Sequence, residues 1–205
     1  MSEATPLERA AGWARIATYC LIALSGLDVF EWGLRNFFAQ GLDTFPVRMF
    51  YLAHDYAMVP TFAAFAVNAH WIYVAAQCYQ DRAHPEAPIR PHWAVWSNFV
   101  PLANLISPFI QICRIYAVAQ AAGNPQAKWL WIWWLAWISP FVLGIMFIVY
   151  LTWFPSQDLI ENGFTFRIEV ILLIAIGADI LAAVLFLRLI NDITLPRLRD
   201  SEVFG

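Results

Sequence analysis

The sequence is short of charge. Charged side chains make up 13% of its 205 residues and sum to a net charge of −3, whereas an average soluble domain carries roughly 25% charged residues. This scarcity excludes an ordinary soluble enzyme and a disordered chain, and the lack of a basic excess excludes a nucleic-acid-binding protein. Apolar residues make up 61% of the chain, a surplus that one globular core of this size cannot bury. We therefore expect a multi-pass membrane protein.

Cysteines and catalytic motifs are also scarce. Cys20, Cys78 and Cys113 lie in apolar stretches without a CxxC pair, which argues against a disulfide framework and a thiolate metal site. No nucleophile elbow, phosphate-binding loop or HExxH string is present. His54 and His70 are separated by about 24 Å along one helix, too far to ligate one haem. We expect no cofactor, no metal site and no catalytic residue.

Four apolar stretches are long enough to cross a hydrocarbon core about 30 Å thick, which needs roughly 20 helical residues. They cover residues 13–33, 57–78, 129–153 and 168–190. A fifth stretch, residues 93–113, is also uncharged, but it contains two prolines and several polar side chains. Such a backbone is tolerated at membrane depth only where protein or water satisfies it.

The distribution of lysine and arginine decides whether the fifth stretch crosses. With four spans and a cytoplasmic N-terminus, nine basic residues fall inside and three outside, whereas a fifth span gives five inside and seven outside. The positive-inside rule favours four spans. The sequence thus predicts one all-α membrane domain over residues 1–205, with both termini cytoplasmic. Residues 92–122 form an interfacial or re-entrant segment between the second and third spans.

Two features mark the interface. Residues 109–122 repeat apolar side chains at helical spacing, which predicts an amphipathic helix that can lie in the interface plane with its apolar face toward the membrane. Five tryptophans crowd the start of the third span, which is typical of an aromatic belt at headgroup level; they are Trp129, Trp131, Trp133, Trp134 and Trp137. We expect the polar tail that begins at Pro196 to be frayed.

Residues 90–108 read Arg-Pro-His-Trp-Ala-Val-Trp-Ser-Asn-Phe-Val-Pro-Leu-Ala-Asn-Leu-Ile-Ser-Pro. The segment resembles a bacterial family of small multi-spanning membrane proteins catalogued as a domain of unknown function. The hallmark of that family is Pro-x-Trp-Ala followed by Phe-x-Pro-x-x-Asn-Leu-x-x-Pro. Arg114 departs from the family's pattern, which has an acidic residue there. The resemblance implies a membrane fold but no activity. The matching residues are Pro91, Trp93, Ala94, Phe99, Pro101, Asn104, Leu105 and Pro108.

The prolines of this segment have a physical role of their own. Pro101 and Pro108 lack a backbone N–H and bias the preceding residue away from the α region. The carbonyls that they free can be satisfied by the side-chain amide of Asn104. Two interpretations stay open: a structural corner that turns the chain toward the third span, and a site for a lipid headgroup or a partner.

Ionisable side chains gather near the outer ends of the first two spans. Asp28, Glu31 and Arg35 lie on the first, and Asp55 lies near the outer end of the second. Glu31 and Arg35 are i,i+4 neighbours on one helical face, so we predict an ion-pair cluster around Arg35. The alternative is a carboxylate-lined vestibule that admits cations or protons.

Asp179 is the deepest ionisable side chain, 11 residues from either end of the fourth span. A carboxylate at the bilayer centre costs about 2.5–3.5 kcal/mol, so it should not face lipid. Counting from the outer ends of the second and fourth spans places Asn68 level with Asp179, and His70 about 3 Å deeper. We predict that Asp179 faces the bundle interior and hydrogen-bonds Asn68 or His70, as a structural contact or as an ion site.

These features favour a small interaction or assembly component of the inner membrane, acting as a homo-oligomer or as an accessory subunit. Its expected partners are membrane lipids and a second copy or another membrane subunit. The alternative is a small transporter or a proton or cation pathway through Asp28, Glu31, Asp55 and Asp179. A third interpretation, a membrane enzyme acting on lipid, lacks a nucleophile or a metal triad.

Overall fold

The computed structural model describes residues 4–38, 58–98, 106–120, 128–153 and 164–203. Four helices within these ranges are long: α1 (Pro6–Phe38), α3 (Met58–Tyr79), α6 (Lys128–Trp153) and α8 (Phe164–Val203). The connection between α3 and α6 contains the 3₁₀ turn η1 (Gln80–Arg82) and the short helices α4 (Pro91–Trp96) and α5 (Ser107–Ala119). The predicted all-α fold is confirmed.

Each long helix contains a stretch long and apolar enough to cross a membrane: Pro6–Phe30, Val59–Arg82, Lys128–Met146 and Val170–Leu195. The four predicted spans are therefore confirmed, with boundaries that differ by several residues. Helices α4 and α5 have six and 13 residues, which is too short to cross a hydrocarbon core. No further candidate span occurs in the described ranges, which leave out residues 99–105. The chain has the organisation of a multi-pass membrane protein.

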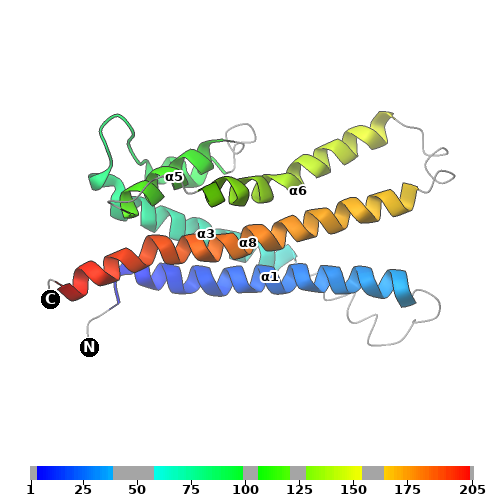
Figure 1. Ribbon diagram of the computed structural model, residues 1–205, viewed down its shortest axis with the longest axis horizontal. Coiled ribbons are helices and arrows are strands. Elements are labelled where there is room, and N and C mark those ends of the chain that lie inside the picture. The colour runs from blue at the N-terminus through cyan, green and yellow to red at the C-terminus, as the bar shows by residue number, and fades with distance from the viewer. Residues whose placement is uncertain (1–3, 39–57, 99–105, 121–127, 154–163, 204–205) are drawn as a thin grey trace.

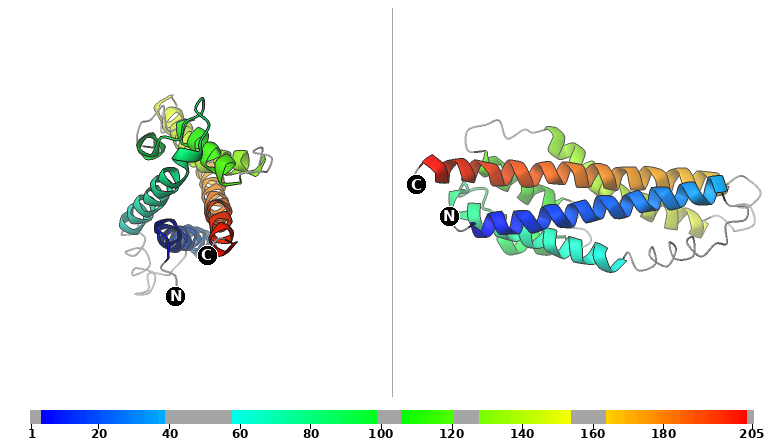
Figure 2. Two further views of the ribbon diagram at one scale, coloured as in Figure 1. Left: turned by 90° about the vertical axis from the view of Figure 1, so that its left-hand side faces the viewer. Right: turned by 90° about the horizontal axis from the view of Figure 1, so that it is seen from below.

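The long helices lie roughly parallel to one axis (Figure 1). Helix α1 begins and α8 ends at the same end of the bundle, which we call the terminal end, and we call the opposite end the distal end. Figure 2 shows α1 and α8 side by side along most of their length, with α3 beside the half of α1 that is nearer the terminal end. Helix α5 lies at the terminal end, where it packs against α8 and α3.

A capping box fixes the start of α1. The backbone N–H of Thr5 donates to the Glu8 carboxylate, and the N–H of Glu8 donates to the Thr5 hydroxyl at 3.3 Å. These two bonds satisfy donors that a helix start leaves without intrahelical partners, and proline suits the first helical position. Helix α1 therefore begins at Pro6, well before the predicted span over residues 13–33.

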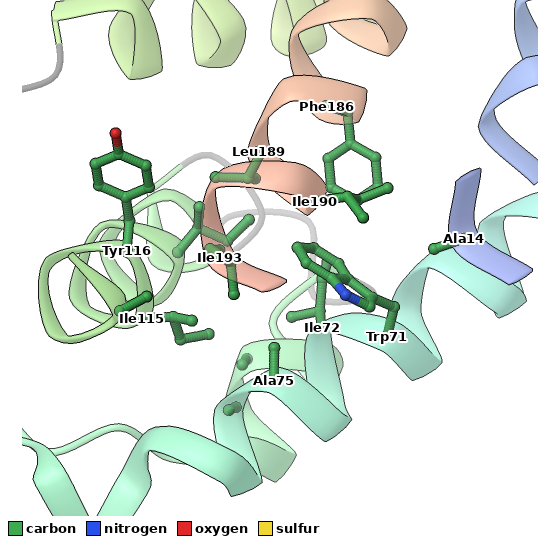
Figure 3. Close-up of a cluster of buried hydrophobic side chains, with 14 of the residues drawn as sticks. Ala14, Trp71, Ile72, Ala75, Ile115, Tyr116, Phe186, Leu189, Ile190 and Ile193 are labelled. Atoms are coloured by element: carbon green, nitrogen blue, oxygen red, sulfur yellow. The ribbon is translucent and has the colours of Figure 1, made fainter. Parts of the chain in front are cut away.

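Among the described residues, the buried core lies toward the terminal end of the bundle. It joins the first half of α1, the second half of α3, α5, the start of α6 and the middle of α8. Figure 3 shows its centre, where Trp71 of α3 faces Phe186 and Ile190 of α8 and where Ile115 of α5 lies near Ile193. Toward the distal end the large apolar side chains are exposed, as expected of helices that contact lipid; they include Phe30, Ile145, Met146, Leu172 and Ile174.

The amphipathic helix predicted over residues 109–122 is present as α5, but its apolar face does not lie on a membrane surface. Phe109, Ile112 and Ile115 are buried in the shared core. The expectation that this face points toward the membrane is therefore wrong. The apolar sides of α3 and α8 bury it instead, which removes the same apolar area from water.

The tryptophan cluster of α6 contains both buried and exposed side chains, because α5 packs against part of it. Phe109 of α5 lies with its ring centroid 4.3 Å from that of Trp131 and 5.7 Å from that of Trp134. Trp133 and Trp134 are buried, whereas Trp131 is exposed. The prediction of an aromatic belt at headgroup level therefore suits Trp131. It is wrong for Trp133 and Trp134, which belong to the core.

A proline inside α6 has a local partner for the carbonyl that it frees. Pro140 cannot donate to the carbonyl of Ala136, four residues earlier, and the hydroxyl of Ser139 donates to this carbonyl at 3.1 Å. Side chains of this kind allow prolines within membrane helices. The helix thus continues to Trp153.

Candidate functional site

Contacts between helices show which residues lie at the same level along the bundle. The Arg15 guanidinium of α1 donates to the Asn191 side chain of α8 at 2.9 Å. Arg188 of α8 lies over the Trp129 ring at 4.8 Å, next to Lys128 at the start of α6. Basic and aromatic residues at one level are typical of a membrane boundary. We place the boundary at the terminal end at this level.

Just beyond this boundary, five side chains form a polar cluster that we call the terminal belt: Tyr79, Tyr116, Gln120, Arg188 and Asp192. The Tyr116 hydroxyl donates to the Asp192 carboxylate at 3.5 Å, and Arg188 lies 3.6 Å from the same oxygen. Burial and the charge of Asp192 raise the pKa of Tyr116, so its phenol stays a hydrogen-bond donor. The terminal belt ties α5 and α3 to α8.

Pro196 explains why the terminal belt forms here. Because it has no N–H, the carbonyl of Asp192 loses its intrahelical donor. The Gln120 amide donates to this carbonyl at 2.8 Å, and the Tyr79 hydroxyl donates to the next carbonyl, that of Ile193, at 2.8 Å. With these carbonyls satisfied, α8 continues to Val203. The expectation of a frayed tail from Pro196 is therefore wrong.

Tyr79→Phe tests this support. The substitution leaves the ring in place and removes the hydroxyl that donates to the Ile193 carbonyl. Because the backbone N–H of Arg197 can still donate to this carbonyl, we expect the free energy of unfolding to fall by about 0.5–1.5 kcal/mol, the net contribution of one hydrogen bond. Thermal unfolding in mild detergent measures the change. Tyr73→Phe is the matched control, because the Tyr73 hydroxyl accepts a bond from an exposed Gln77 amide. Equal stability of the two variants would contradict the role assigned to Tyr79.

Asn68 has a different neighbour from the one that the sequence predicted. Its amide oxygen lies 3.4 Å from the Thr18 hydroxyl of α1, which also donates to the Ala14 carbonyl at 2.7 Å. Both side chains are buried. They form a polar contact between the first and second spans, whereas His70 is exposed on α3.

Asp179 makes no hydrogen bond to Asn68 or His70, all three of which lie in the described part of the chain. It is exposed in the isolated chain instead of pointing into the bundle. The predicted pairing is therefore wrong. Aromatic contact joins Trp71 of α3 to Phe186 of α8, a register about one helical turn away from the alignment obtained by counting span ends. Asn68 consequently lies nearer the terminal end than Asp179.

The neighbour of Asp179 is Asp28 of α1, which is close enough for the two carboxyl groups to interact electrostatically. By helical rise, Asp179 lies about 14 Å and Asp28 about 20 Å from the boundary at Arg188 and Arg15. Both groups lie within the candidate spans Pro6–Phe30 and Val170–Leu195. The sequence had assigned Asp28 to an outer cluster and Asp179 to an inner contact, but the antiparallel packing of α1 and α8 brings them together.

Most of the other predicted site residues lie outside the described part of the chain. The side chains of Glu31 and Arg35 lie outside the described residues, as do Asp55, Pro101 and Asn104 in full, so the predicted Arg35 cluster and proline corner stay predictions. Pro108 is buried in the first turn of α5, where a missing N–H is harmless. Within the described ranges, no three His, Cys, Asp or Glu side chains are grouped so that they can hold a metal ion.

Comparison with known proteins gives one family and no individual relative. No curated protein and no solved structure matches the chain significantly. The family model described as "Domain of unknown function (DUF4328)" matches residues 48–195. The match covers the chain from α3 to α8 as far as Leu195, with the loop that holds the two prolines and all five residues of the terminal belt. Since this is well over half of the chain, the protein belongs to the DUF4328 family.

Proposed function

We propose that this protein is an assembly component of the bacterial inner membrane, which self-associates through the distal halves of α1 and α8. Both termini lie in the cytoplasm in this arrangement, as the bias of basic residues favours. The observation that carries the proposal is the exposure of Asp179 at hydrocarbon depth beside Asp28.

A carboxyl group in this position must be shielded from lipid by protein or water. Ionisable side chains within membrane spans almost always face a bundle interior, a partner group or a water-filled cavity. In the described part of this chain, Asp179 has no cationic partner, and its electrostatic neighbour is a second acid. Another protein surface packed over α1 and α8 would remove the side chain from lipid.

Two glycines in the distal halves of α1 and α8 leave room for close packing of another helix. A Cβ atom built at Gly26 of α1 or at Gly177 of α8 would contact nothing within the described chain. In membrane helices, small residues let backbones approach closely at helix–helix interfaces. Each lies two residues from one of the acids, about 200° around its helix, and faces open space within the described chain.

A second copy of the chain is the occupant that fits this face best. A two-fold axis along the membrane normal brings one surface against itself, so that Asp179 of one copy meets Asp179 of the other. Carboxyl groups in such proximity share protons, because two adjacent charges cannot both be maintained. The contact then needs no basic residue, and the described part of this face supplies none.

Gly177→Leu tests the proposal without disturbing the monomer, since the added side chain projects into open space. We expect self-association in liposomes, measured by single-molecule photobleaching, to weaken at least tenfold because leucine blocks close backbone approach. Gly144→Leu on α6 is the matched control, as its Cβ also meets nothing, and it should associate like the unmodified chain.

Normal association of the Gly177→Leu variant would overturn the proposed contact. Loss of association in the Gly144→Leu variant alone would move the interface to α6 and would equally overturn it. Capture of a different membrane subunit, without self-association of the purified chain, would replace the second copy with a heteromeric partner.

A proton or cation pathway is the second candidate, and the proximity of Asp28 and Asp179 favours it. Against it, aromatic rings pack the core between these acids and the terminal end, where Phe186 contacts both Trp71 and Trp133. Proton flux into liposomes separates the two candidates. A pathway predicts that Asp179→Asn abolishes flux while Gly177→Leu preserves it.

A further inference from the structure

The loop after η1 and helix α4 enclose a shallow depression of about 420 Å³ on the side of the bundle. Its lining combines one arginine, one histidine and two tryptophans with two apolar residues; the residues are Ile89, Arg90, Pro91, His92, Trp93 and Trp96. Arg90 and both tryptophans are exposed. Cationic and aromatic groups side by side on a surface are typical of a membrane interface.

Side chains of α5 hold the loop that lines the depression. The backbone N–H of Arg90 donates to the buried Gln111 side chain at 3.2 Å, and the Arg114 guanidinium donates to the Pro88 carbonyl at 2.9 Å. Ile89 and Ala94 anchor the two sides of the loop in the core. The Arg90 side chain is left available, because its backbone and not its guanidinium makes the anchoring bond.

The depth of α4 matches the membrane boundary at the terminal end. The His92 ring lies 5.3 Å from the Tyr73 ring of α3. Tyr73 follows Trp71, which contacts Phe186, so it is level with the region of Arg188 on α8. Arg90, Trp93 and Trp96 are therefore placed where phospholipid headgroups meet the acyl chains.

We propose that this depression binds the headgroup phosphate of an anionic phospholipid. Arg90 donates to the phosphate oxygens, a charge-assisted bond that suits a guanidinium. Trp93 and Trp96 contact the glycerol and the first methylene groups, as amphipathic indoles do at this depth. Charge in the surrounding loop favours an anion, since Arg82, Arg90 and Arg114 outnumber Asp81 and Glu86.

Native mass spectrometry of the detergent-solubilised chain tests this site. With phosphatidylglycerol and phosphatidylcholine at equal concentration, we expect roughly tenfold higher occupancy by phosphatidylglycerol, which is about 1.4 kcal/mol. Arg90→Gln should abolish this preference, whereas Arg82→Gln, which lies outside the depression, should keep it. Trp96→Ala should lower the occupancy of both lipids several-fold while keeping the preference.

A preference for phosphatidylglycerol that survives Arg90→Gln would overturn the proposal. Equal losses in the Arg90→Gln and Arg82→Gln variants would also overturn it, because they would show diffuse attraction to the whole loop. The site does not depend on self-association, which the Gly177→Leu variant tests separately in the distal half of α8.

Discussion

Replacing Trp71 with alanine is expected to lower the free energy of unfolding in mild detergent by about 3–5 kcal/mol, the range for truncating a large aromatic side chain in a core. Trp71 is 1% exposed and packs edge-on against Phe186, with ring centroids 5.4 Å apart. It fills the space between α3 and α8 where α1 also approaches through Ala14 (Figure 3). The close-packed neighbours cannot collapse fully into the cavity. Thermal unfolding followed by circular dichroism measures the loss.

Two variants separate packing from other effects. Trp131→Ala removes the same side chain from a site that is 59% exposed, and it should change stability by less than about 0.5 kcal/mol. Trp71→Phe should recover much of the stability, because the Trp71 indole nitrogen makes no hydrogen bond within the described residues. If the Trp71→Ala variant unfolded at the same temperature as the Trp131→Ala variant, Trp71 would not contribute to the stabilising core.

Cys113 is expected to react with a water-soluble maleimide roughly 100-fold more slowly than an exposed cysteine near neutral pH, because the thiolate is the reacting form. Burial on α5 raises the pKa of the Cys113 thiol from 9.0 to about 11. Since the neutral form is favoured, the thiolate fraction grows only at high pH. The labelling rate should therefore keep rising until pH about 11.

The measurement needs a chain in which Cys20 and Cys78 are replaced by serine. The reference is the same chain with Cys113 also replaced and with Gln80→Cys, an exposed position of η1. Its labelling rate should level off near the ordinary thiol pKa. A Cys113 profile that levels off at the same pH would mean that α5 does not bury this side chain.

The spans could be predicted because the decisive signal is local. Crossing a bilayer needs a run of about 20 apolar residues, and such a run is visible without knowledge of its neighbours. The helix over Ser107–Ala119 was predicted for the same reason, from apolar spacing. The start of α1 also had a local signal in Thr5, Pro6 and Glu8.

The contacts between spans could not be predicted in this way. Counting residues from the span ends assumes that all spans start level, whereas side-chain packing sets the register of α3 against α8. A shift of about one turn moved Asn68 away from Asp179 and toward Thr18. Likewise, nothing in the composition of the tryptophan cluster shows that α5 covers Trp133 and Trp134 but leaves Trp131 exposed.

The sequence contains one signal for the terminal belt, which is Pro196. A proline four residues after Asp192 frees the carbonyl of that residue, so a donor was required if α8 continued past Pro196. Gln120 and Tyr79 supply donors at this place. Their distance from Pro196 in the sequence hides the connection.

The single core at the terminal end has a consequence for biosynthesis. It joins Leu7 and Ala11 of the first helix to Leu189 and Ile193 of the last, so the ribosome must deliver almost the entire chain before the core can close. Until then, Phe109 and Ile115 of α5 lack the α8 side chains that cover them in the finished core. Partly made chains with exposed apolar surface are prone to aggregation. A truncation before α8 is therefore expected to leave inserted spans that proteases remove, even though the first three spans are intact.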